Sequence, residues 1–199
     1  MRRLRTPLLI LAAIVAVALL VKGVGFVRLL ARWRELDRTY AETFPSPAEV
    51  APALAGRTVL FHVKTGLDQD DSQICVGFNI ILATIESRAK VTVIFDAGAV
   101  LDLTDKRHNL ERTGVPVRLR KLIVAQTHIP EAKAPTDYGR YLDLLHERGA
   151  TIYADTEMNV VSGASDKVRT RFARYPYVEP ILYAGIAGEI AKADVRIVY

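Results

Sequence analysis

The chain has 199 residues, half of them apolar, and a formal net charge of +5, which suits one globular domain with a short appendage. Residues 1–38 carry eight basic and two acidic residues, so the remaining 161 residues, with 19 basic and 20 acidic, are nearly neutral. Because a nucleic-acid-binding domain concentrates positive charge on its folded part, this distribution argues against a nucleic-acid partner.

An apolar segment opens the chain. Only Lys22 interrupts the apolar character of residues 7–27, and about 20 such residues suffice for a helix to cross a bilayer. Lys22 lies near one end of the segment, where its ammonium group can reach the headgroups. The alternative is a cleaved secretory signal, but the Ala-x-Ala pattern of Ala16 and Ala18 lies inside the apolar run. We therefore expect residues 7–27 to anchor the chain in a lipid bilayer.

The orientation of this single-pass anchor in the cell membrane stays open. Basic residues lie on both sides of the apolar segment, so the positive-inside rule gives no strong asymmetry. We favour a short N-terminal tail inside the cell and the domain outside the cytoplasm.

Proline residues separate the anchor from the folded domain. A helical continuation is expected over residues 28–44, and Pro45, Pro47 and Pro52 then break helical structure. The expected division is an anchor with a juxtamembrane helix at 1–38, a proline-rich linker at 39–56 and a folded domain at 57–199.

Strands and helices alternate in the domain. Residues 58–63 are rich in β-branched and aromatic side chains and predict a buried strand. Asp70 or Asp71 caps a helix that runs to about Ser87, and residues 91–95 form a second strand. A strand, helix and strand of these lengths predict a right-handed βαβ unit with parallel strands.

The alternation continues to the end of the chain. The further expected elements are a helical turn at 99–103, a helix or a strand at 117–125, helices at 137–148 and 179–191, and strands at 150–154 and 195–199. Together these elements predict a three-layer α/β domain with a mostly parallel sheet and flanking helices.

The order of these segments resembles the DsrE/DsrF-like family, whose domain has the YchN-like α/β fold. The matching segments are VLFHVKTG at 59–66, VTVIFDAGAV at 91–100, LHERGATIY at 145–153 and ADVRIVY at 193–199. The resemblance implies sulfur handling and small homo- or hetero-oligomers. Sulfur-carrying members place a cysteine just after the strand that matches 151–154. Residues 155–159 of this chain contain none, which argues against persulfide transfer.

Cys75 is the single cysteine of the chain, so it excludes an intramolecular disulfide and a multi-cysteine zinc site. Its place early in a helix favours a thiolate. However, it shares the apolar helix face with Phe78 and Leu82, and the negative charges of Asp70 and Asp71 oppose a thiolate. We expect a buried structural thiol, with a sulfur-transfer or redox role for Cys75 as the alternative.

Polar and small residues follow the carboxyl ends of the predicted parallel strands, where α/β proteins usually bind ligands. Loops are expected there at 65–71, 96–100 and 155–159, and Gly66 and Gly98 would allow a ligand to approach the backbone closely. The candidate ligand-binding residues are Thr65, Gly66, Asp68, Asp96, Gly98, Asp155 and Glu157. The alternative is that they are ordinary turn residues.

No metal site and no cofactor is expected. The acidic cluster of Asp68, Asp70 and Asp71 has the ligands of a hard cation, but acids before a helix are better explained as caps. The four histidines lack metal-ligand spacing on a common helix face, and no phosphate-binding glycine motif is present.

These observations favour a membrane-anchored, DsrE-like module that is noncatalytic. It would act through homo- or hetero-oligomeric assembly or partner binding in a sulfur-related or respiratory system. Two alternatives stay open, a sulfur-transfer or redox protein that uses Cys75 and a small-ligand or metal binder at the carboxyl edge of the sheet.

Overall fold

The computed structural model describes residues 27–28, 31–32, 34, 51–104, 109–127, 129–163, 165 and 172–199. The chain divides into two compact units, Met1–Phe44 and Pro45–Tyr199. In the first unit the described residues are helical and exposed. The predicted anchor at 7–27 lies outside the described residues except for Val27. In the part of the chain that the structure describes, no helix combines the length and apolar character needed to cross a membrane.

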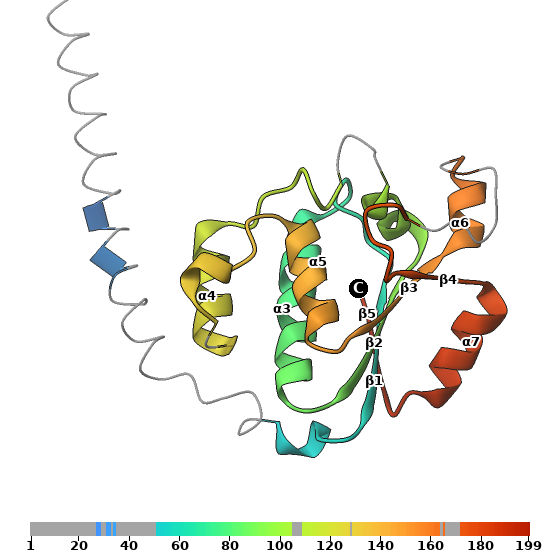
Figure 1. Cartoon of the computed structure of the whole chain (residues 1–199), viewed down its shortest axis with the longest axis horizontal. Coiled ribbons are helices and arrows are strands. Elements are labelled where there is room, and N and C mark those ends of the chain that lie inside the picture. The colour runs from blue at the N-terminus through green and yellow to red at the C-terminus, as the bar shows by residue number, and fades with distance from the viewer. Residues whose placement is uncertain are drawn as a thin grey trace, which may run out of the picture. The chain divides into compact units, whose positions relative to one another are not determined.

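The described residues of the second unit contain a five-stranded, all-parallel sheet (Figure 1). The strand order is β4-β3-β2-β1-β5. The strands are β1 (Thr58–Val63), β2 (Lys90–Phe95), β3 (Thr151–Asp155), β4 (Glu179–Ile181) and β5 (Val195–Val198). The predicted α/β fold with a parallel sheet is therefore confirmed.

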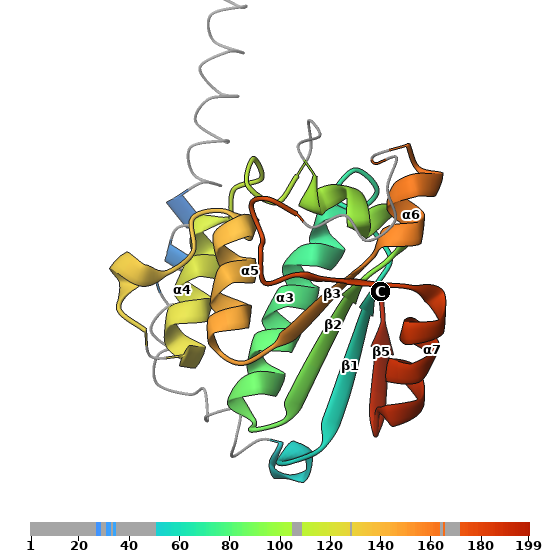
Figure 2. The same cartoon turned by 45° about the vertical axis from the view of Figure 1, so that its right-hand side comes forward.

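Helices flank both faces of the sheet, as Figures 1 and 2 show. One face carries α3 (Asp71–Glu86), α4 (Val117–Thr127) and α5 (Tyr138–Glu147), whereas α7 (Tyr183–Lys192) packs on the other. The short helix α6 (Thr156–Val161) continues directly from β3. Three 3-10 segments complete the described elements, η1 (Pro52–Leu54), η2 (Ala97–Leu103) and η3 (Glu131–Lys133).

Two apolar cores of different size hold these layers together. The main core lies between the sheet and the α3 side, where the Phe78 ring meets Phe95, Tyr138 and Tyr141 edge-on at centroid distances of 6.3, 5.9 and 5.4 Å. The smaller core consists of Leu60, Ile94, Ile181 and Ile186 under α7. Because side chains alternate along a strand, Phe61 and Leu60 point into different cores.

Two predictions on local structure need correction, and one open assignment is resolved. The predicted loop at 155–159 is the start of α6, because the Asp155 carboxylate caps the helix. The predicted helix at 179–191 begins only at Tyr183, since residues 179–181 form β4. This strand has three residues and contains Pro180, so it lacks the length and composition that identify a strand in the sequence. The open segment at 117–125 is helical, with Leu119 and Ile123 buried one turn apart.

Candidate functional site

His62 lies near the carboxyl end of β1, on the sheet face that carries α7. Because side chains alternate along a strand, His62 points to the same face as Leu60, whereas Phe61 points into the main core. Its side chain is 5% exposed, and its Nε2 lies 2.8 Å from Asp96 Oδ2. The hydrogen-bond partner of His62 lies 34 positions away along the chain. Burial lowers the pKa of His62 although Asp96 opposes this shift.

Asp96 directly follows β2 and is the centre of the site. Its Oδ1 accepts a 2.6 Å hydrogen bond from the Ala97 amide, and its Oδ2 faces both His62 and the Lys64 ammonium, with Lys64 Nζ at 3.7 Å. Burial opposes ionisation of this carboxyl. The hydrogen bonds from Ala97 and His62 outweigh burial, so the pKa of Asp96 lies below its usual value.

Asp155 ends β3 and lies beside Asp96. The parallel register pairs Phe95 with Ala154, so the next residue of each strand is one of the two aspartates. Asp155 is fully buried, and its Oδ1 accepts hydrogen bonds from Glu157 N at 2.9 Å and Met158 N at 3.4 Å. No N–H or O–H donor among the described residues reaches its other oxygen, Oδ2.

A proton shared between the two carboxyl groups links Asp155 to Asp96. Burial raises the pKa of Asp155 to about 6, and the neighbouring Asp96 carboxylate adds to this shift. We call His62, Asp96 and Asp155 the carboxylate site. It holds a hydrogen-bonded chain of three titratable groups at the carboxyl edge of three adjacent strands.

More charged and polar groups surround the carboxylate site. Glu157 Oε2 accepts a 2.6 Å hydrogen bond from Tyr183 N and so caps the first turn of α7. Partial burial and the negative charge of Asp155, Glu157 and Asp96 raise the pKa of Tyr183. Lys64 is about half exposed, with 48% of its side chain accessible, and Arg196 of β5 acts electrostatically on His62. The surroundings are therefore acidic next to the two aspartates and basic toward β5.

The structure places the predicted glycines in close packing between loops. A Cβ on Gly66 would lie 2.7 Å from the Gly98 carbonyl oxygen, and a Cβ on Gly98 would lie 3.0 Å from Gln69 Oε1. Thr65 donates its amide to the Tyr199 carbonyl oxygen at 3.3 Å. At both glycines, protein atoms occupy the side on which a side chain would lie. Of the seven predicted residues, Asp96, Asp155 and Glu157 come together with His62, and Asp68 is exposed in the β1–α3 loop.

Asp102 is a buried acid that sequence reasoning missed. It is 3% exposed in η2, and both of its carboxylate oxygens accept from Leu67 N, at 3.1 and 3.0 Å. Burial raises the pKa of Asp102 to about 7, and the charge of Asp68 adds to the shift. The sequence does contain a signal for this buried acid, since Asp102 is the one charged residue among the apolar Val100, Leu101 and Leu103. This carboxylate fastens the β1–α3 loop to η2.

Cys75 lies on the other side of the sheet. It is half-buried against the main core on α3 and hydrogen-bonds the Tyr138 hydroxyl. The expected structural position is thus present, although the thiol is less buried than predicted. Because the carboxylate site faces α7, the thiol and the two aspartates lie on opposite faces of the sheet. Cys75 therefore cannot act together with the carboxylate site in one reaction.

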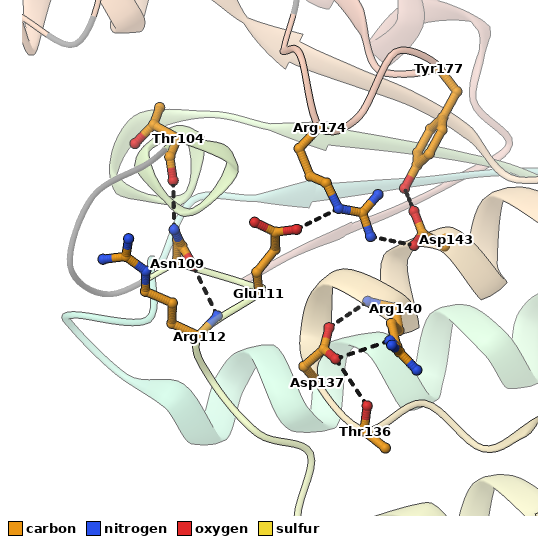
Figure 3. A network of polar contacts seen from close by, with 10 residues as sticks. All are labelled: Thr104, Asn109, Glu111, Arg112, Thr136, Asp137, Arg140, Asp143, Arg174 and Tyr177. Atoms are coloured by element: carbon orange, nitrogen blue, oxygen red, sulfur yellow. Dashed lines mark hydrogen bonds and ion pairs between the residues drawn. The ribbon is translucent and has the colours of Figure 1, made fainter. Parts of the chain in front are cut away.

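A second polar cluster lies beside α5 (Figure 3). Arg174 bridges Glu111 and Asp143, and the Tyr177 hydroxyl donates to Asp143 at 2.6 Å. His146 stacks on the Tyr177 ring at 4.2 Å. These contacts bind residues 174–177 to α5, so we interpret the cluster as structural.

Metal binding gains no support from the geometry. In residues 51–104, 109–127, 129–163, 165 and 172–199, no group of three or more His, Cys, Asp or Glu side chains is arranged to hold a metal ion. His108 and His128 lie outside the described residues.

No protein-family model and no curated protein matches the chain. The function must therefore be argued from the site itself.

Proposed function

We propose that this protein is a membrane-anchored, DsrE-like module that binds a ligand or partner group at the carboxylate site and is not itself a catalyst. One observation carries the proposal, the buried carboxyl pair of Asp155 and Asp96, in which no N–H or hydroxyl group of another described residue donates to Asp155 Oδ2. Leaving a buried polar atom without a hydrogen bond costs about 1–3 kcal/mol, and among the described groups only a proton shared with Asp96 can avoid this cost. A donor from a bound ligand could take the place of that proton.

The position of the site also supports binding. Ligands of open α/β sheets bind at the carboxyl ends of the strands, and His62, Asp96 and Asp155 lie at the ends of three adjacent parallel strands. The DsrE-like assignment supports assembly as a homo- or hetero-oligomer in a sulfur-related or respiratory system. The apolar segment at 7–27 supports attachment to the membrane.

A noncatalytic role follows from the place of the thiol. Residues 155–159 contain no cysteine, and Cys75 lies on the opposite face of the sheet. A persulfide formed on Cys75 would have none of the acid or base groups of the carboxylate site within reach.

Persulfide transfer gives a direct test. Full-length protein in detergent is incubated with glutathione persulfide, and sulfur on the chain is measured by intact mass. We expect no stable addition to wild type beyond that seen for Cys75→Ser. Rapid, stoichiometric addition to Cys75 would overturn the noncatalytic reading and favour the sulfur-transfer alternative.

Ligand binding is tested by thermal denaturation of the full-length protein with a panel of cationic, anionic and neutral small molecules. We expect at least one compound to raise the Tm of wild type and to lose this effect in Asp96→Asn. Glu131→Gln removes one negative charge on η3 and is the matched control. A panel without effect on wild type, together with pull-downs from membranes that recover no partner sensitive to Asp96→Asn, would contradict the binding function.

A further inference from the structure

We infer that the ligand of the carboxylate site presents a cationic nitrogen, an ammonium or guanidinium group, that is held by Asp96 and Asp155. This inference rests on the proposed binding function and names the chemical class of its ligand. The observation behind it is a fully buried carboxyl group, Asp155, whose Oδ2 accepts from no N–H or hydroxyl group of the described residues and whose side chain shares a proton with the Asp96 carboxylate.

The donor that best replaces the proton shared by Asp96 and Asp155 is a hydrogen-bond donor with positive charge. Asp155 Oδ2 can only accept unless it is protonated, and its polar neighbour Asp96 is an acceptor as well. An N–H group placed between the two oxygens would satisfy both, and charge-assisted hydrogen bonds of this kind are about twice as strong as neutral ones.

Anionic ligands are disfavoured at this edge. Helix N-termini attract anions when their amides are free. Here carboxylates already occupy the first turns, with Asp96 at η2, Asp155 at α6 and Glu157 at α7. A phosphate or carboxylate ligand would meet these three carboxyl groups first, and the negative charge of Glu157 and of the Asp96–Asp155 pair would repel it. A metal ion is also disfavoured, because the described side chains offer no metal-binding arrangement.

Lys64 shows that an ammonium can approach the site from solvent. Its Nζ lies 3.7 Å from Asp96 Oδ2, beyond ordinary hydrogen-bond distance, and 48% of its side chain is exposed. An exposed pair of this length is weak, so a ligand nitrogen can replace it. The Asp96 side chain is 13% exposed, whereas Asp155 is fully buried, so a ligand from solvent would reach Asp96 first.

Binding of a cation is coupled to release of one proton. When the cationic nitrogen enters, the proton shared by Asp96 and Asp155 leaves to solvent and both carboxylates become charged. Six described groups in and around the carboxylate site influence this equilibrium. They are His62 of β1, Lys64 after β1, Asp96 after β2, Glu157 of α6, Tyr183 of α7 and Arg196 of β5.

Calorimetric titration tests the inference with the full-length protein in detergent. The probes are n-butylammonium and methylguanidinium, with butyrate and n-butanol as anionic and neutral controls of similar size. We expect saturable binding of the cations alone. Since the shared proton leaves with a pKa of about 6, the apparent Kd should weaken about tenfold from pH 7 to pH 5. Buffers of different ionisation enthalpy should show close to one proton released per cation at pH 5.

Two variants make the test specific. Asp155→Asn should abolish both cation binding and proton release, whereas Glu131→Gln should change neither. Lys64→Gln removes the competing ammonium at a half-exposed position, where we expect little effect on folding, and should tighten cation binding about two- to fivefold. Lys64→Gln keeps the test decisive if Asp155→Asn does not fold.

Several results would overturn the inference. One is that neither cation binds to wild type at either pH, and another is that butyrate or butanol binds as tightly as the cations. The others are an unchanged cation affinity in Asp155→Asn and a weaker cation affinity in Lys64→Gln. A neutral or anionic compound that stabilises wild type but not Asp96→Asn would reject the cationic ligand and leave the proposed binding function intact.

Discussion

Among single residues, two buried aspartates make the stability of the fold depend on pH. Asp102 and Asp155 are almost completely enclosed, and burial raises the pKa of each carboxyl, to about 7 and about 6. An acid with a raised pKa in the folded state holds its proton where the unfolded chain has lost it. Its favourable contribution to the free energy of unfolding is fully present below pH 3.8, the pKa in the unfolded chain. This contribution is lost as the pH rises through the pKa of the folded state. Both groups therefore favour the folded state more at mildly acidic than at neutral pH.

Asp102→Asn tests this linkage. The amide oxygen can still accept from Leu67 N, but it carries no ionisation cost at high pH. Relative to wild type, the variant should therefore gain on the order of 2 kcal/mol of unfolding free energy between pH 5 and pH 8. Urea denaturation at the two pH values measures this, with Glu131→Gln, at an exposed position of η3, as control. Parallel pH profiles for wild type and Asp102→Asn would show that Asp102 is ionised throughout.

At the element scale, close packing between the β1–α3 loop and η2 decides where the polar residues lie. Gly66 and Gly98 let the two backbones approach, and Asp102 bonds Leu67 across the same contact. The loops after β1 and β2 are thereby joined. This contact fixes the start of η2, which the Asp96 side chain caps.

Gly66→Ala should disturb this contact. The added methyl group would meet the Gly98 backbone at 2.7 Å, so the loop must move, at a cost of about 1–3 kcal/mol. The matched control is Gly188→Ala in α7, where a Cβ meets nothing within 4 Å. There alanine should stabilise by up to about 1 kcal/mol through its higher helix propensity. Thermal or urea unfolding of both variants measures the two changes in stability. Equal changes would contradict the packing role of Gly66.

Helix caps offer another test at this scale. The Asp137 side chain accepts a hydrogen bond from Arg140 N and starts α5. Asp137→Ala should lower the unfolding free energy by about 1 kcal/mol, whereas Asp137→Ser should retain most of the stability. Urea denaturation measures both. Identical losses in the two variants would mean that the cap contributes little.

At the scale of the whole molecule, the two faces of the sheet are unequally covered. Six residues of α3 are buried, including Ile74, Phe78, Ile81 and Leu82, whereas Ile186 is the buried residue of α7. Fewer buried apolar contacts allow an element to open at lower free energy. The carboxylate site lies on the less protected face, where ligands can enter with little disruption of the main core.

Hydrogen exchange should show this inequality. We expect the amides of residues 183–192 to exchange well before those of 74–86 under native conditions, as measured by mass spectrometry of peptides. A cation that occupies the carboxylate site should slow exchange in α7, whose first amide bonds Glu157. Equal protection of α3 and α7 without ligand would contradict the proposed difference between the two faces.

Local pattern in the sequence predicts most elements of this fold. The apolar runs of β1, β2 and β3 and the helical spacing of α3 and α5 are properties of neighbouring residues, so they can be recognised without the fold. The caps at Asp70 and Asp137 belong to the same class, since each bonds an amide two or three residues away. β4 and α6 are exceptions. In β4, three residues with a proline carry too little pattern, and α6 is a short helix that starts directly where β3 ends.

The strand order and the site were decided only by the tertiary structure. The sequence predicted that Asp96 and Asp155 lie at the carboxyl edge, but not that His62 bonds Asp96 or that Asp155 is buried without a donor. Those facts depend on which strands become neighbours and on which face α7 covers. The periodicity of one segment indicates which of its residues face the core and which face solvent. The pairing of distant segments, in contrast, is set by the packing of the whole chain.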